Sequence, residues 1–205
     1  MKLGYRTLDR KVEIPERSII LVISPQIPAK LELLSRFLKT GSQKGEPGIF
    51  VTTDRLPSEI RERLGEAPEV AIVDCVSWSV PDRRERDVFQ VPGPAALNEL
   101  SVAIERARES VFKPGKPMRM VFDSVSTLLL YTNPNTIFRF VQVIANRARA
   151  SFTTLLLTLQ KDMHEPKVVS TLEHLTDGTA ELREERGKVY IKFSRLFETG
   201  WVELE

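Results

Sequence analysis

The chain has 205 residues, of which 41% are hydrophobic and 28% charged, so one sizeable soluble domain with its own core is expected. Thirty Lys and Arg residues against 28 Asp and Glu residues give a net charge of +2, which excludes a general attraction to nucleic acid but leaves a local basic patch open. The longest aliphatic runs are strand-sized and the start, MKLGYRTLDR, has no apolar signal segment, so we expect no membrane span and a cytoplasmic location.

Apolar runs of strand length alternate with helical patterns along most of the chain. Strands are predicted at 18–23, 48–53, 69–75, 118–124 and 153–160, and helices at 31–41, 57–65, 96–112 and 135–150. Near-continuous apolar strands separated by helices are typical of a parallel sheet covered on both faces. The fold class is therefore α/β, in three layers.

From Gly178 onward the pattern changes to short strands without intervening helices. Turns are predicted at 185–187 (ERG) and 199–200 (TG), and an antiparallel extension on the sheet edge is expected. We therefore predict one domain over 1–205, made of an α/β core at 1–177 and a β extension at 178–205.

Two further features stand in the middle of the chain. The single cysteine, Cys75, lies in the apolar run VAIVDC and is predicted to be a buried strand thiol in a reducing compartment, and with both histidines far from it we expect no zinc or iron cluster. The stretch 76–94 is irregular and carries prolines, which is typical of a long functional or mobile loop.

The segment SPQIPAKL lies between the first strand and the first long helix, where a phosphate-binding loop would lie. The motif places Ser24 and Ala29 at its two glycines, Lys30 at its lysine and Leu31 at its magnesium-binding hydroxyl. Only the lysine is kept. The candidate remnant of a nucleotide site consists of Ser24, Pro25, Gln26, Ile27, Pro28, Ala29, Lys30 and Leu31.

Each substitution in this segment works against phosphate binding. Ser and Ala adopt positive φ angles with difficulty, and Pro28 removes an amide donor. Leu31 offers no oxygen to Mg²⁺, and Glu32 puts a negative charge early in the helix. Considered alone, PAKLELL is an ordinary helix start with Pro at its first position.

Four segments in order resemble the RecA superfamily, and within it the KaiC-like and archaeal RadA-paralogue ATPases, which have a P-loop NTPase fold. These segments are Ile14 with Pro15, then 44–64, 119–130 and 171–178. The resemblance covers most of the chain. It implies a RecA-like core in which any nucleotide lies at the carboxyl ends of the strands, between the subunits of a ring or filament.

The resemblance also assigns positions outside the loop. Asp123 matches the Walker B carboxylate that holds the Mg²⁺ water shell, although a strand-terminal Asp before Ser is equally typical of a helix cap. Asp54 and Arg55 stand where the family carries two glutamates, one of which orients the attacking water; a polar loop that caps the next helix is the alternative. Gln160 matches the γ-phosphate sensor, or is a solvated loop residue.

Late in the chain the family often carries a Lys-x-Arg pair that reaches the neighbour's nucleotide. Arg195 stands at the Lys and Phe197 at the Arg, so half of this trans finger is lost. The downstream loop, which often bears a His, is shortened to TGW. Because loop glycines, magnesium hydroxyl, glutamate pair and finger are altered together, no catalytic residues are expected.

Three functions follow as hypotheses. The first is a non-catalytic scaffold or regulatory subunit, without cofactor, that binds a protein partner, an active paralogue or further copies of itself. The second is a Mg-ATP-binding protein with little or no hydrolysis that uses Lys30, Asp123 and Gln160. The third is a DNA recombination or repair accessory, supported only by the run RRER at 83–86 and by Arg139, Arg147 and Arg149; the run is nearly neutralised by Asp82, Glu85 and Asp87.

Several aromatic residues are predicted to belong to the core, which is the usual place for aromatics at such spacing. The alternative is an assembly surface, for which the TGW turn and Phe197 are the candidates. The aromatic set comprises Tyr131, Phe138, Phe140, Phe152, Phe197 and Trp201.

Overall fold

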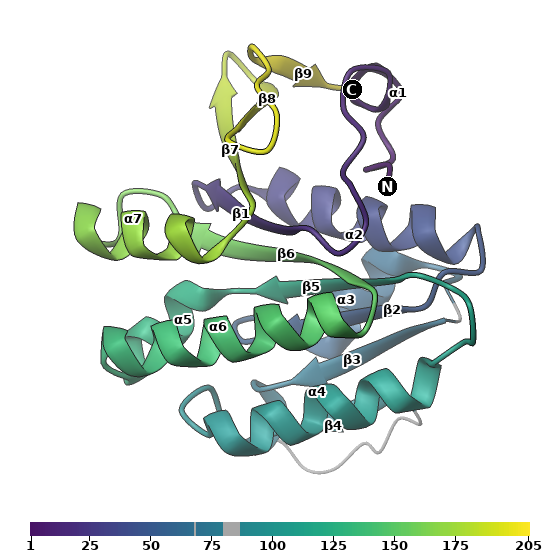
Figure 1. The fold of residues 1–205 in the computed structure, drawn as a ribbon, viewed down its shortest axis with the longest axis vertical. Coiled ribbons are helices and arrows are strands. Elements are labelled where there is room, and N and C mark those ends of the chain that lie inside the picture. The colour runs from purple at the N-terminus through teal and green to yellow at the C-terminus, as the bar shows by residue number, and fades with distance from the viewer. Residues whose placement is uncertain (68, 80–86) are drawn as a thin grey trace.

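A computed structural model describes residues 1–67, 69–79 and 87–205. In this part of the chain nine strands form one sheet in the order β4-β3-β2-β5-β6-β1-β7-β8-β9, with helices on both faces (Figure 1). The predicted three-layer α/β fold is confirmed. The strands are β1 (Ile19–Ser24), β2 (Gly48–Thr52), β3 (Val70–Asp74), β4 (Val88–Gln90), β5 (Met118–Asp123), β6 (Thr153–Gln160), β7 (Gly178–Glu185), β8 (Lys188–Ser194) and β9 (Val202–Leu204).

The long helices are α2 (Pro28–Ser42), α3 (Pro57–Leu64), α4 (Leu97–Val111), α6 (Pro134–Ala150) and α7 (Pro166–Leu175), and the short ones are α1 (Arg6–Asp9), α5 (Val125–Tyr131) and the 3₁₀ turn η1 (Ser77–Ser79). Four of the helices, α2, α3, α4 and α6, fill connections where the apolar pattern predicts a helix, whereas the others were not predicted. Four of the five long helices begin with a proline at the first helical position, where its fixed φ suits the helix and its missing N–H costs nothing.

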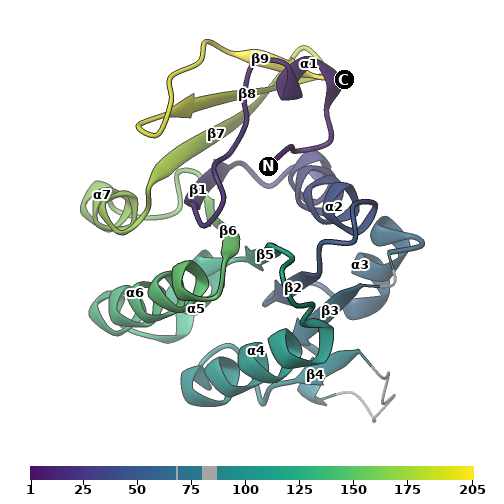
Figure 2. The same cartoon turned by 45° about the vertical axis from the view of Figure 1, so that its right-hand side comes forward.

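The direction of each crossover decides which face of the sheet its helix covers. The chain moves one way through the sheet from β1 to β4 and then the other way from β4 through β5 and β6 to β7. Because crossovers between parallel strands are right-handed, α2 and α3 lie on one face, and α4, α5, α6 and α7 lie on the other. The turned view in Figure 2 shows these two helix layers separated by the sheet.

Two hydrophobic clusters correspond to the two faces. One joins Leu100, Ile104, Phe140 and Ile144 to the sheet, and the other joins Leu34 and Phe37 of α2 to β1 and to the C-terminal strands. Strands buried on both faces carry continuous apolar side chains, as the runs IILVI and VAIV show.

Three predictions about the fold need correction. The stretch 76–94 is not loop throughout, because Val88–Gln90 pairs with β3 as a parallel edge strand. The C-terminal extension becomes antiparallel only at β8, since β7 still pairs in parallel with β1. Tyr131 and Phe152 are not core residues, being 64% and 53% exposed.

Other predictions hold. The ERG segment joins β7 and β8 in a hairpin, with Glu185 opposite Lys188. Cys75 is buried, and burial raises the pKa of its thiol to about 12. Phe140 is buried, whereas Phe138, Phe197 and Trp201 are partly buried. The run RRER at 83–86 lies outside the described residues.

None of the helices in the described part of the chain has the length and apolar character needed to cross a membrane.

Candidate functional site

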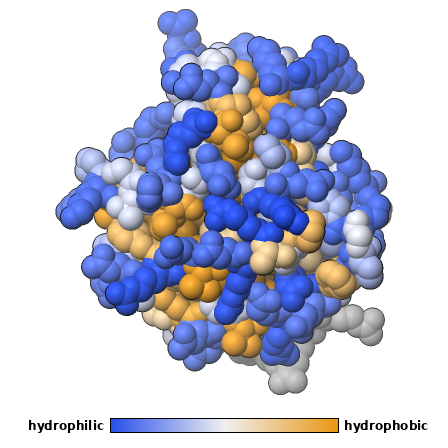
Figure 3. All heavy atoms as spheres, in the orientation of Figure 1, coloured by the Kyte–Doolittle hydropathy of each residue, from blue (hydrophilic) through white to orange (hydrophobic). Residues whose placement is uncertain are grey.

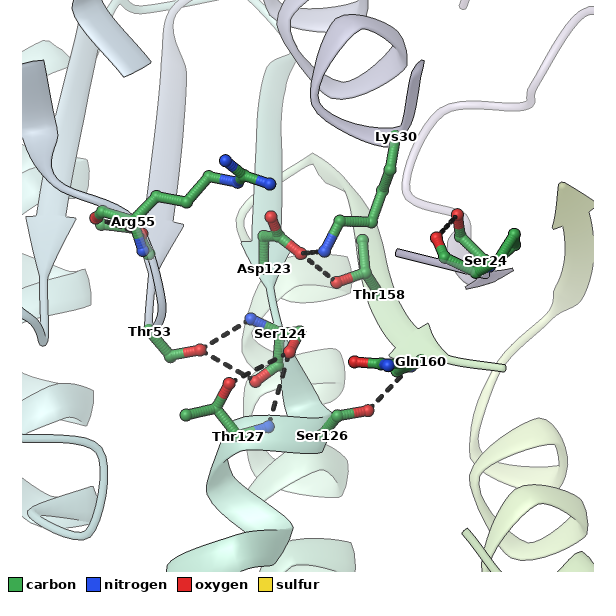
Figure 4. Close-up of polar contacts among 12 residues, drawn as sticks. Ser24, Lys30, Thr53, Arg55, Asp123, Ser124, Ser126, Thr127, Thr158 and Gln160 are labelled. Atoms are coloured by element: carbon green, nitrogen blue, oxygen red, sulfur yellow. Dashed lines mark hydrogen bonds and ion pairs between the residues drawn. The ribbon is translucent and has the colours of Figure 1, made fainter. Parts of the chain in front are cut away.

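The carboxyl ends of the central strands meet at one edge of the sheet and bring the predicted site residues together. In register, Thr52 of β2 lies beside Asp123 of β5, and Ser24 of β1 lies beside Gln160 of β6. Parallel strands end on the same side, so polar residues distant in sequence converge there. Figure 4 shows this group of side chains.

The segment that would cradle phosphate is a three-residue turn followed at once by α2. Ile27 is the N-cap in an extended conformation and Pro28 is the first helical residue. Pro25 and Pro28 have no N–H, and the N–H groups of Ile27 and Lys30 donate to the carbonyls of Pro25 and Ile27 at 2.9 and 3.1 Å. A phosphate-binding loop works through unpaired amides that converge on the anion, and most of these are missing or already bonded here.

Lys30, which the resemblance matches to the lysine of a phosphate loop, points into the protein interior. Its Nζ lies 2.6 Å from Oδ1 of Asp123, and both side chains are buried. The hydroxyl of Thr158 on β6 donates to the same oxygen at 2.6 Å (Figure 4). The lysine expected at the phosphates and the carboxylate expected at the metal thus neutralise each other, and Lys30 is not a surface residue.

Asp54 and Arg55 follow β2 on the same edge. Asp54 is exposed, and the pKa of its carboxyl is raised, first by partial desolvation and then by the nearby charge of Asp123. Arg55 exchanges two hydrogen bonds with Thr52 and pairs with Glu59 at 3.4 Å. Its Nε is buried without a hydrogen-bond partner among the described residues, and in Figure 4 its guanidinium points towards Asp123, whose Oδ2 has no partner among them either.

The helix-cap role weighed for Asp123 belongs to its neighbour. Ser124 is the N-cap of α5, and its Oγ accepts a hydrogen bond from the Thr127 amide. Thr53 bridges to the same residue, since its hydroxyl donates to the Ser124 carbonyl and accepts from the Ser124 amide. Asp123 is therefore free of capping and directs its carboxylate at Lys30 and Thr158.

Gln160 ends β6 beside a serine–histidine pair. Its backbone N–H donates to Oγ of Ser126 at 2.7 Å, and Nε2 of His164 lies 2.8 Å from the same oxygen. Burial lowers the pKa of His164, which favours the neutral ring at neutral pH. This pair fixes the backbone of Gln160, while the Gln160 side chain stays partly exposed.

Arg195 is not part of this cluster within its own chain. It lies just after β8 with a φ of 77°, and its guanidinium donates to the backbone carbonyl of Glu173 near the end of α7. Phe197 packs on Phe193 with ring centroids 5.0 Å apart. Glu32 also turns away from the cluster and pairs with Arg36 at 2.6 Å.

A magnesium nucleotide would need groups that this edge does not supply. Leu31 is buried and has no ligand oxygen, while Oδ1 of Asp123 is taken by Lys30 and Thr158. No three His, Cys, Asp or Glu side chains among the described residues come together as a metal site. The residues present do not fit the hydrolytic site that the resemblance implies.

Sequence reasoning missed Thr158, Ser126 and His164. Thr158 could have been predicted, because it is a polar residue that interrupts an apolar strand two residues before Gln160. Residues two apart in a strand lie on the same face, so Thr158 lies on the face of Gln160. No sequence feature indicated Ser126 or His164, since a serine early in a helix and a histidine in a turn are common surface residues.

Known structures give the fold its class. A KaiC-like protein, PH0186 from Pyrococcus horikoshii, matches with a TM-score of 0.70 and 17% identity over 99% of this chain and 91% of that one. The uncharacterized protein PH0321 of the same organism, solved in complex with an unknown peptide, gives 0.71 and 14% over 96% and 91%. The chain therefore has the KaiC-like, RecA-type fold.

The family follows from sequence. The chain belongs to DUF7504, a family of unknown function whose model matches residues 18–182. A UPF0273 protein of Thermotoga maritima is 28% identical over 200 residues, which is 89% of this chain and 78% of that protein.

Proposed function

We propose that the chain is a non-catalytic, KaiC-like protein that keeps the RecA-type fold as a scaffold or regulatory subunit. The observation that carries this proposal is the buried contact of 2.6 Å between Lys30 and Asp123. Loss of the phosphate loop alone would leave Lys30 and Asp123 available to a ligand. Here the ammonium group of Lys30 is instead paired with Oδ1 of Asp123. A phosphate group would have to break this contact before Lys30 could bind it.

The free-energy cost of breaking the ion pair between Lys30 and Asp123 can be estimated from electrostatics. Removing one member of a buried ion pair costs about 3 to 5 kcal/mol, because the other charge is left uncompensated in a medium of low dielectric constant. A nucleotide would have to repay this cost with few loop amides and no magnesium hydroxyl. The altered positions at Asp54, Arg55 and Phe197 support the same conclusion.

The test is thermal unfolding of the purified protein with and without Mg·ATP, together with a phosphate-release assay. A ligand that binds only the native state must raise the melting temperature. We expect no rise and no magnesium-dependent turnover, and an active RecA-type ATPase under the same conditions serves as the positive control. Turnover that scales with protein concentration and disappears in Asp123→Asn would refute the proposal.

One observation favours a second candidate, a protein that binds nucleotide with little or no hydrolysis. In the part of the chain that the structure describes, Oδ2 of Asp123 and Nε of Arg55 are both buried without partners, so a ligand could satisfy them. This candidate predicts a rise in melting temperature with Mg·ATP that Lys30→Ala abolishes.

The DNA-accessory hypothesis gains less support, because Arg149 is paired with Asp177 at 2.9 Å.

A further inference from the structure

The connection between β6 and α7, residues 161–165, is a short turn at the carboxyl edge of the sheet. Asp162 and Met163 are exposed, and Asp162 has a φ of 60°, a left-handed conformation that few residues other than glycine adopt. In Figure 3, which has the orientation of Figure 1, hydrophilic side chains are mixed with apolar patches over α5, α6 and α7. A turn that is open to solvent on its outer side depends on its inward contacts for a fixed shape.

His164 makes such an inward contact. Its Nε2 lies 2.8 Å from Oγ of Ser126 on α5, and the same oxygen accepts the backbone N–H of Gln160 at 2.7 Å. Figure 4 shows the contact between Ser126 and Gln160. Ser126 is only 2% exposed and His164 is partly buried. A single serine hydroxyl thus joins α5, the end of β6 and the β6–α7 connection.

The donors in this group determine the protonation state of His164. The Gln160 amide can only donate, so Oγ of Ser126 is its acceptor. The hydroxyl proton of Ser126 then donates to Nε2 of His164, since Oγ has no further partner among the residues that the structure describes. Nε2 accepts this bond only while it carries no proton. The contact therefore requires a neutral imidazole with its proton on Nδ1.

The charged residues around His164 do not compensate a protonated ring. α5 and β6 carry no charged residue. Lys161 is paired with Glu181 of β7 at 2.7 Å. The other charged residues of the connection and of the first turn of α7 are all exposed to solvent, namely Asp162, Glu165 and Lys167. Burial consequently lowers the pKa of His164 below its usual 6.5.

We propose that the hydrogen bond between His164 and Ser126 is a pH-sensitive contact that holds the β6–α7 connection against α5. Protonation of His164 removes the acceptor of the Ser126 hydroxyl and brings a positive charge into a partly buried place without a counter-ion. The connection then opens, and the Gln160 amide becomes accessible to water. This inference does not depend on whether nucleotide chemistry has been lost.

The experiment is hydrogen exchange at the Gln160 amide, followed by NMR between about pH 5 and 8, the range over which histidine titrates. Dividing each rate by the rate expected for an unstructured chain gives a protection factor that reports only the opening of the contact. Above the usual histidine pKa of 6.5 this factor should be constant. At lower pH it should fall by up to about tenfold per pH unit, until the pH reaches the lower pKa of the closed state.

Two variants separate His164 from other effects of acid. His164→Gln keeps a polar side chain that takes up no proton in this range, so the protection factor of Gln160 should no longer depend on pH. The matched control is His174→Gln, which replaces the other histidine of the chain, on α7, and should leave the pH dependence as in wild type. Far-UV circular dichroism checks that both variants are folded.

Amides of the central strands distinguish local opening from unfolding of the whole domain. Val121 on β5 and Leu157 on β6 lie in the core and should stay protected over the whole pH range. A Gln160 protection factor that is constant with pH in wild type would overturn the proposal. A fall on acidification that persists in His164→Gln, or one that Val121 and Leu157 share, would overturn it as well.

Discussion

At the scale of single residues, the buried ion pair between Lys30 and Asp123 determines what the site can bind. Its side chain and that of Asp123 are 10% and 0% exposed, so their charges depend on one another. Thr158 adds a charge-assisted hydrogen bond to the same carboxylate oxygen. Lys30 is thus part of the folded interior, which predicts an effect of its replacement on stability.

Lys30→Met tests this role. Methionine keeps the length and apolar stem but leaves Asp123 buried without its cation, so the free energy of unfolding should fall by about 3 to 5 kcal/mol. Lys30→Met/Asp123→Asn removes both charges and should recover part of the loss. Urea unfolding of the wild type, both single variants and the double variant measures the coupling, and strictly additive effects would contradict it.

Asp54→Asn tests the electrostatics of the same edge. Because partial desolvation and then Asp123 raise the pKa of Asp54 above its usual 3.8, the native state holds this proton more tightly than the unfolded chain. The free energy of unfolding therefore falls as pH rises from the unfolded-state pKa through the higher pKa of the native state. The melting temperatures of variant and wild type should agree below pH 3.8 and diverge in favour of the variant towards neutral pH.

The exposed Glu184→Gln on β7 serves as the control for that comparison. It removes a carboxylate far from Asp123, so its melting temperature should follow that of wild type across the same pH range. A difference for Asp54→Asn that is constant with pH would show that the raised pKa is not the cause.

At the scale of elements, α2 is fixed to β5 at its C-terminal end as well as at Lys30. Arg119 of β5 is fully buried and reaches under the helix, where Nε binds Glu46 at 2.6 Å and the guanidinium donates to the Phe37 carbonyl at 2.8 Å. Gly41 lets the helix backbone pass this side chain. A Cβ at that position would lie 2.5 Å from Cδ and Nε of Arg119.

Gly41→Ala should therefore destabilise the protein, although alanine is the better helix former by about 1 kcal/mol. Arg119 is held by its hydrogen bonds and cannot move aside, so overpacking should cost about 1 to 3 kcal/mol net. Gly200→Ala is the control, since a Cβ there meets nothing within 4 Å. Urea denaturation compares the stabilities of the Gly41→Ala and Gly200→Ala variants. Equal midpoints would show that the Arg119 side chain moves aside without cost.

Most elements could be predicted because their sequences are locally consistent with them. The runs IILVI and TTLLLTLQ are apolar enough to be buried on both faces, and proline marks the start of α3. β4 could not be predicted, because a three-residue edge strand is defined by pairing with β3 rather than by its own pattern. The parallel pairing of β7 also depends on β1, its neighbour in space.

The candidate site could be predicted only in part. Sequence placed Lys30 and Asp123 at their motif positions, because strand ends and helix starts are visible in the pattern. That the two side chains bind each other depends on rotamers and on the short turn at Pro25–Ile27, which no sequence spacing reveals. Thr158 joins them only because β6 pairs with β5.

At the scale of the whole molecule, the C-terminal strands form part of the same core as α2. Leu182, Ile191 and Phe193 belong to the cluster that contains Ile20 and Leu34. β7 also covers one edge of β1 by parallel pairing. The core and the extension should therefore unfold together, as a single two-state unit.

A single-tryptophan variant can follow the extension by itself. The chain has two tryptophans, and Trp78 is 61% exposed, so Trp78→Phe should leave the fold intact and Trp201 as the only probe. The guanidinium carbon of Arg183 on β7 lies 4.2 Å from the ring centroid of Trp201, so Trp201 reports on the packing of β7 against the segment that precedes β9. Trp201 fluorescence and helical circular dichroism should lose half their signal at the same urea concentration, because removing the extension would expose Ile20 and leave β1 unpaired on one side. A fluorescence transition that clearly precedes the loss of helix would instead mean that residues 178–205 detach from a core that stands without them.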